Sequence, residues 1–239
     1  MVKLFRNPRR QASDRSRSRK LNPDQIVNRV GLNDLAPDLK TFLTVAGYLQ
    51  LSFFELLSGA VLAAPSIEAK LRAAQIAQSL LSRHLAIVAR LKSEGFDPAE
   101  QMEPISLQID DFRARLTGTD WYESMLGYFV ASGILDEALI SISLGYSSEL
   151  PKAMAELLDD EQVHSIVVES LQEAIESNPR LASRLALFGR SLVGDVFLVT
   201  RSALRLPAES ESDEERLEPA FTELIANHTR RMDELGLTA

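Results

Sequence analysis

The sequence predicts an all-α protein in which two long helical hairpins form a four-helix bundle, with a long crossover between the second and third helices and accessory helices at the C-terminal end. After Pro37 the apolar residues recur at spacings of three and four, the period of amphipathic helices. Alternating apolar and polar runs bounded by turn residues, which mark strands, are missing from the sequence. Proline and glycine break the helical pattern at a few places and divide it into hairpins.

The first hairpin is predicted to consist of helices at 38–62 and 66–93. Pro65 ends the first helix, because proline cannot continue one. Ser66 suits the N-cap of the second helix, since its hydroxyl can accept a hydrogen bond from a free backbone N–H. Gly95 ends the second helix, because glycine adopts the left-handed conformation that closes helices.

Residues 95–119 contain two prolines and a glycine near the end, and are predicted to be a long connection with room only for short helical turns. A third helix is expected at 121–144, capped by Thr119 or Asp120. The fourth, at 151–177, begins with a proline, which is favoured in the first turn. Two hairpins joined by one long connection match the ferritin-like bundle with its single crossover.

The rest of the chain is predicted to hold a fifth helix at 180–206 and, after an acidic stretch, an amphipathic helix that ends near Leu235. The expected organisation is therefore a basic disordered tail at 1–24, the helical bundle at 25–207, and an acidic linker with a C-terminal helix at 208–239.

Charge is unevenly distributed along the chain. The net charge is −8, but residues 1–20 carry eight Lys or Arg against one acidic residue, so the remainder is strongly acidic. Such a body repels phosphate backbones, and nucleic acid is not an expected partner except through the basic tail. The tail suits an arm for RNA or an acidic partner, or simply a solubilising segment.

Other features exclude whole classes of function. The chain has no cysteine, which excludes disulfides, thiolate metal sites and cysteine nucleophiles. No uninterrupted apolar run reaches the eighteen or so residues that a membrane span needs, so no membrane partner is expected. The first twenty residues lack the apolar core of a secretory signal, and the cytoplasm is the expected location.

Polar residues interrupt the apolar seams near the middle of the predicted helices. His84 lies on the second helix, Glu137 on the third, and Glu161 and His164 on the fourth. A Glu-x-x-His pair plus a carboxylate from the neighbouring helix is half of a ferritin-type di-iron box. Hairpin symmetry about residue 149 places Glu161 level with Glu137. These four residues are the predicted ligands of iron or another divalent metal.

The other half of the box is altered. Leu81 stands where the pattern needs glutamate, and Gln50 stands where a second carboxylate is expected. Glu55, Gln50 and Asp195 are weaker candidate ligands. The alternative is a metal-free polar core, because buried carboxylates need partners, which arginines can supply as salt bridges. The candidate arginines are Arg83, Arg184 and Arg190. The third histidine, His228, lies in a polar helix and is expected to be exposed.

Several short pieces between residues 40 and 205 carry a family resemblance: Phe54-Glu55-Leu56, Ala64-Pro65 before Lys70, Thr119-Asp120-Trp121, Ser132-Gly133-Ile134 with Glu137, Glu161-x-x-His164, and Arg184-Leu-Ala-Leu-Phe-Gly-Arg190 followed by Leu192-Val-Gly-Asp195. Together they resemble the bacterial tRNA-hydroxylase-like (MiaE-like) branch of the ferritin superfamily.

The resemblance implies a carboxylate-bridged di-iron fold whose named member hydroxylates a modified tRNA nucleoside. By position, it assigns the family's metal ligands to His84, Glu137, Glu161 and His164. Asp195 falls near an acidic position of the family. Gln50 and Leu81 stand where the family has glutamates, and Ser132 where it tends to have aspartate.

Three functional hypotheses follow. The first is a bundle descended from di-iron oxygenases with an altered site that binds one metal and performs an oxidation. The second is a non-enzymatic structural or interaction protein, in which the polar seam residues fix helix register and exposed helices form a homodimer. The third is a nucleic-acid adaptor that uses the basic tail.

Overall fold

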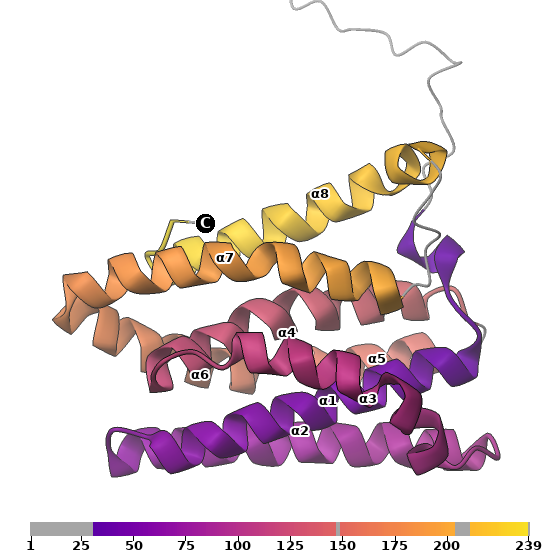
Figure 1. The fold of residues 1–239 in the computed structure, drawn as a ribbon, viewed down its shortest axis with the longest axis horizontal. Helices are drawn as coiled ribbons and strands as arrows, with labels where there is room; N and C mark the ends of the chain where they lie inside the picture. The colour runs from indigo at the N-terminus through magenta and orange to yellow at the C-terminus, as the bar shows by residue number, and fades with distance from the viewer. Residues whose placement is uncertain (1–30, 147–148, 204–210, 239) are drawn as a thin grey trace, which may run out of the picture.

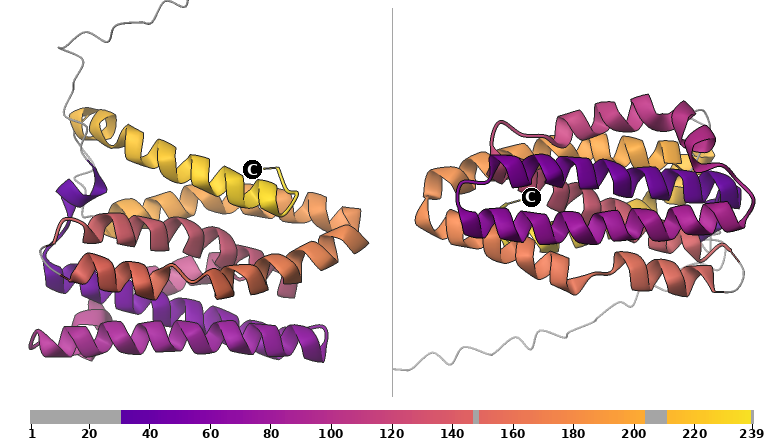
Figure 2. Two further views of the ribbon diagram at one scale, coloured as in Figure 1. Left: turned by 180° about the vertical axis from the view of Figure 1, so that it is seen from behind. Right: turned by 90° about the horizontal axis from the view of Figure 1, so that it is seen from below.

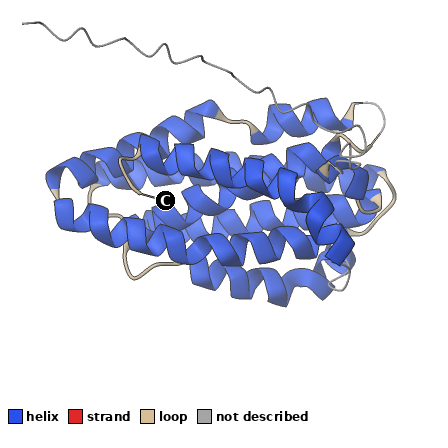
Figure 3. Cartoon of the chain, turned by 90° about the horizontal axis from the view of Figure 1, so that it is seen from above, coloured by secondary structure: helices blue, strands red, loops and turns tan. Residues whose placement is uncertain are grey.

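The computed structural model describes residues 31–146, 149–203 and 211–238, and within these ranges it contains helices and no strand (Figures 1 and 3). A short 3-10 turn, η2 (Leu32–Leu35), comes first. The helices that follow are α1 (Leu39–Ala63), α2 (Ile67–Ser93), α3 (Pro98–Leu116), α4 (Trp121–Ser143), α5 (Leu150–Leu158), α6 (Glu161–Ser177), α7 (Pro179–Ala203) and α8 (Glu211–Glu234). The predicted all-α fold class is confirmed. The predicted tail at 1–24 and the boundary between 207 and 208 lie outside the described residues.

The helices lie side by side along the long axis of the molecule (Figures 1 and 2). The α1–α2 hairpin forms one edge, and α7 and α8 lie toward the opposite edge. Between them, α4 contacts α1, α3, α5, α6, α7 and α8. Apolar residues occur on all sides of α4, and a helix of this kind is stable only when other helices surround it.

Among the described residues, two helices, α1 and α4, are long and apolar enough to cross a membrane by length and composition alone. In the most apolar stretch of α4, 78% of the residues are buried inside the bundle, and in α1 the share is 50%. Core helices of bundles have the same composition, so the burial of these two helices accounts for it.

The predicted caps of the long helices are confirmed. Ser66 Oγ accepts a hydrogen bond from the Ala69 backbone N–H at 3.1 Å and starts α2. Asp120, one of two candidates for the next cap, accepts from the Glu123 backbone N–H at 3.0 Å. Gly95 has a φ of 86°, the left-handed conformation expected after α2.

The long connection is the first difference from the prediction, because 98–116 forms the helix α3. Asp97 caps this helix by accepting from the Glu100 backbone N–H at 3.0 Å, and Pro98 occupies the first turn. Pro104 lies inside the helix and removes one backbone donor. The loss is offset by four buried residues, which pack the helix against its neighbours: Met102, Ile109, Phe112 and Leu116.

The predicted helix at 151–177 is also divided, since α5 ends at Leu158 and α6 begins at Glu161. Asp160 caps α6 by accepting from the Val163 backbone N–H at 3.1 Å. A residue that favours an N-cap competes with helix continuation, and here the helix ends before Asp160 and a new one begins after it. The break turns the Asp160 side chain toward α2.

Candidate functional site

Polar side chains from four different parts of the bundle meet at its centre. Gln50 on α1 donates from Nε2 to Asp136 Oδ1 on α4 at 2.8 Å. The Arg83 guanidinium on α2 donates to Asp136 Oδ2 at 3.2 Å and lies 3.2 Å from Asp160 Oδ2 at the start of α6. Ser79 Oγ also donates to Asp160, at 2.8 Å. We call Gln50, Arg83, Asp136 and Asp160 the central network.

Burial strengthens the electrostatic interactions within the central network. Arg83 is 3% exposed, Asp136 is 8% exposed and Gln50 is fully buried. Burial raises the pKa of Asp136 to about 6, although the positive charge of Arg83 and the hydrogen bond from Gln50 oppose the shift. Burial acts on Asp160 in the same direction, but hydrogen bonds from Ser79, from a backbone N–H and from Arg83 outweigh it and lower its pKa.

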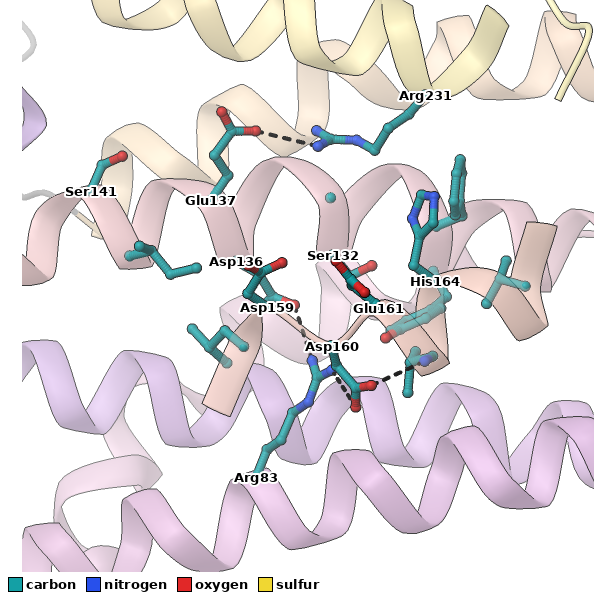
Figure 4. A pocket seen from close by; sticks show the side chains of 17 residues that line it. Arg83, Ser132, Asp136, Glu137, Ser141, Asp159, Asp160, Glu161, His164 and Arg231 are labelled. Atoms are coloured by element: carbon teal, nitrogen blue, oxygen red, sulfur yellow. Dashed lines mark hydrogen bonds and ion pairs between the residues drawn. The ribbon is translucent and has the colours of Figure 1, made fainter. Parts of the chain in front are cut away.

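A cavity of about 510 Å³ adjoins the network, in the size range of small-molecule sites (Figure 4). It lies between α4, the α5–α6 break, Arg83 of α2 and Arg231 of α8. Its apolar wall is formed mainly by Tyr128, Phe129, Ile140, Leu158, Val163 and Val167. Its charged lining residues are Arg83, Asp136, Glu137, Asp159, Asp160, Glu161 and Arg231, with His164 beside them.

Comparison with protein-family models places the whole bundle in one class. Residues 36–212 match the model of a ferritin-like domain of actinomycetes, a match that spans α1 to α7. The chain belongs to this ferritin-like family. No curated protein matches it. The finer resemblance, to the tRNA-hydroxylase-like branch, stays a prediction.

Neither candidate histidine ring of this ferritin-like chain bonds to a side chain of the central network among the described residues. His84 is half-buried, and its Nδ1 lies 2.9 Å from the Gly47 carbonyl oxygen of α1. His164 stacks against Phe129 with ring centroids 5.4 Å apart, and its Nε2 lies 2.9 Å from Glu234 Oε2 of α8. Among the described residues each ring has a different partner, and a common depth of the two rings in the interior stays a prediction.

The two candidate glutamates do not form a joint site either. Glu137 accepts hydrogen bonds from Asn227 and from Arg231 Nη1, the latter at 3.3 Å, so it connects α4 to α8. Glu161 is exposed beside the cavity and has no hydrogen-bond or ion-pair partner among the residues that the structure describes. The predicted pairing of Glu137 with Glu161 as ligands of one ion is therefore not visible in the geometry.

The weaker candidates have separate surroundings. Glu55 is exposed and lies 3.1 Å from Arg113 Nε, and Asp195 lies 2.8 Å from Arg115 Nη1. Gln50 alone lies at the centre, as its seam position indicated, and its Oε1 has no partner in the described part of the chain. Leu81 is only half-buried, so it does not lie at the centre.

The three candidate arginines separate in the same way. Arg83 lies in the central network. Arg184 pairs with Asp120 and Glu123 beside the start of α4, and Arg190 donates to the Thr238 carbonyl oxygen at 3.1 Å. Of these three arginines, Arg83 alone supplies a buried positive charge to the central network.

The remaining histidine corrects another expectation. His228 on α8 is 3% exposed rather than exposed, and its Nε2 has no partner among the described residues. Burial, with a contribution from the charge of Arg231, lowers the pKa of His228 to about 4, so the ring is neutral at pH 7.

As placed, the candidate ligands do not fit a divalent metal. Nowhere in the described ranges do three or more His, Asp or Glu side chains come together as a metal site would require. The two central carboxylates instead face a guanidinium, which has no lone pair to offer a metal. The metal site therefore stays a prediction.

At three places the central network contains the residue next to a predicted ligand. The network contains the buried Arg83 rather than His84, the buried Asp136 rather than Glu137, and Asp160, the half-buried N-cap of α6, rather than Glu161. A helix turns about 100° per residue, so adjacent positions belong to neighbouring seams that periodicity separates poorly. The sequence signal that favours Arg83, Asp136 and Asp160 is their charge balance, since one cation faces two anions.

Proposed function

We propose that this ferritin-like protein is a metal-independent, non-enzymatic interaction protein whose bundle centre is held by an ion-pair network. The supporting observation is the position of Arg83, 3% exposed and within 3.2 Å of carboxylate oxygens from two other helices. A guanidinium between carboxylates supplies the positive charge that a bound cation would otherwise provide.

Such a network specifies how the helices are arranged. Its hydrogen bonds connect α1, α2, α4 and the start of α6, and a shift of one helix along another would break at least one of them. Buried ion pairs add little net stability compared with apolar residues of similar size, but a missing partner is strongly unfavourable. We infer that the network fixes helix register in the bundle.

Metal analysis tests this proposal against the oxygenase hypothesis. The full-length protein is loaded anaerobically with Fe(II), Mn(II) or Zn(II), desalted, and measured for metal per chain. The proposal predicts far less than one equivalent of each metal and the same content in His164→Ala. One equivalent of metal that is lost in His164→Ala or Glu161→Gln would instead support a working metal site and the oxidation chemistry that the sequence resemblance implies.

A further inference from the structure

The outward face of α2 is free of charge. Between residues 71 and 89, the exposed residues are Leu71, Ala74, Gln75, Gln78, Ser82, Leu85, Ala86 and Ala89. A quarter of the chain is charged, so a neutral exposed face more than four turns long is unusual for its surface. The helix forms an outer edge of the molecule, with its far side turned away from the other helices (Figures 1 and 2).

This neutral face carries a coiled-coil pattern. Alternating steps of four and three residues give the outer seam: Ile67, Leu71, Ala74, Gln78, Leu81, Leu85, Val88 and Lys92. Ile67, Leu71 and Leu85 are 71%, 66% and 56% exposed. The helix has a separate inner seam that packs into the bundle, formed by Ala73, Ile76, Leu80, Arg83 and Ile87. The inner seam of α2 therefore has its partners, whereas the outer seam is exposed among the described residues except at the half-buried Leu81 and Val88.

We propose that the outer seam of α2 is a dimer interface, on which α2 of a second copy lies antiparallel about a two-fold axis between Ser79 and Leu80. The seam is symmetric about this point, as a two-fold contact requires. Leu71 faces the partner's Val88, and Ala74 faces the partner's Leu85. A large residue therefore meets a small or medium one at these levels, which suits close helix packing.

Charge at the helix ends favours the antiparallel arrangement. The first turn of α2 contains Glu68, and the last turn contains Arg90 and Lys92. Antiparallel pairing brings Glu68 close to the partner's Lys92 and opposes the two helix dipoles. Parallel pairing would place like charges side by side at both ends of the helix pair. Their repulsion would add to the general repulsion between two chains of negative net charge.

The size of the seam sets the expected affinity. From Ile67 to Lys92 it spans 26 residues, or about 38 Å of helix. A contact of this length buries on the order of 1,000 Å² in total, the low end of specific interfaces. Dimerisation should therefore be reversible, with a Kd on the order of micromolar. None of the outer-seam residues belongs to the central network, so this inference and the metal-independent function can fail separately.

Oligomeric state tests the interface. Sedimentation equilibrium of the full chain should show a monomer–dimer equilibrium at protein concentrations from about 1 to 200 µM, a range that brackets a micromolar Kd. Leu85→Glu should shift it to monomer throughout, by at least about tenfold in Kd. Leu107→Glu is the matched control, because Leu107 is 74% exposed on α3 and should leave the equilibrium unchanged. A wild type that stays monomeric at 200 µM, or a Leu85→Glu variant that still dimerises, overturns the proposal.

Cross-linking tests the orientation of the two helices. Because the sequence contains no cysteine, a thiol-specific reagent reacts only at the introduced residue. The single variants Ala74→Cys and Leu85→Cys are treated with a short bismaleimide, alone and mixed. Antiparallel pairing predicts cross-linked dimer mainly in the mixture, because equivalent residues of two copies then lie about 16 Å apart along the axis. Cross-linking of each variant alone but not of the mixture would show a parallel contact and refute the proposed register.

Discussion

Replacing Arg83 with methionine should destabilise the protein by about 3–5 kcal/mol at pH 7.5, because it leaves a buried carboxylate without its counter-charge. Methionine retains an unbranched apolar stem of similar length, so the packing around it changes little. Asp160 keeps hydrogen bonds from Ser79 and from the Val163 backbone N–H, whereas Asp136 keeps only Gln50. The loss should therefore arise mainly at Asp136.

The size of this loss should depend on pH. In the wild type, burial already holds the pKa of Asp136 at about 6, above the ordinary value of 3.8, and loss of the Arg83 charge should raise it further. A carboxyl whose pKa is higher in the folded than in the unfolded state stabilises the fold at pH values below its unfolded-state pKa. That stabilisation is lost as pH rises through its folded-state pKa. The variant should thus be closer to the wild type at pH 5 than at pH 7.5, by about 1.4 kcal/mol for each unit of added shift.

Urea unfolding followed by far-ultraviolet circular dichroism at both pH values measures these differences. Arg115→Met is the matched control, since Arg115 pairs with Asp195 at the surface and its side chain is 58% exposed. The control should lose less than about 1 kcal/mol. If Arg83→Met loses less than about 1 kcal/mol at pH 7.5, or the same amount at both pH values, the central network does not have the proposed role.

Three further predictions concern other parts of the fold. Gly127→Ala should destabilise by about 1–3 kcal/mol, because its new Cβ would overlap the Leu116 backbone carbonyl, whereas Gly194→Ala meets open space and should be neutral or stabilising in thermal unfolding. His228→Gln should weaken the fall in melting temperature between pH 6.5 and 4, since a histidine with a lowered folded pKa loses stability as pH drops; an unchanged acid profile would contradict its burial as a neutral ring. His164→Ala should speed amide hydrogen exchange in the last turns of α8 while α1 and α2 keep their protection, and uniform protection would show that its contact with α8 is unimportant.

Most of the helical framework could be predicted from the sequence, because local chemistry determines it. Ser66 was expected to cap a helix and does so, Asp120 is the one of two expected candidates that caps α4, and the apolar period identified the long helices. The helix α3 was missed because Pro98 and Pro104 suggested a loop. Pro98 is compatible with a first turn, and tertiary packing of the apolar residues of α3 overrides the single interior proline.

The candidate site was harder to predict, because it depends on the rotation of each helix about its axis. A histidine attracts attention as a ligand, yet His84 bonds to the Gly47 carbonyl of α1 and His164 to Glu234 of α8. The break at Asp160 also changed which residue faces inward, and nothing in the apolar period predicts that break. Gln50 was placed correctly, since its neighbours on α1 are apolar on both sides of its seam and leave it no other position.

An anomalous-scattering experiment at the metal absorption edge, on crystals grown with Fe(II) or Mn(II), tests the central claim most directly. The account predicts no anomalous peak at the bundle centre and clear density for the Arg83 guanidinium between Asp136 and Asp160. An ordered metal peak coordinated by His164 with Glu161 or Glu137, with Arg83 displaced from the two aspartates, would contradict it.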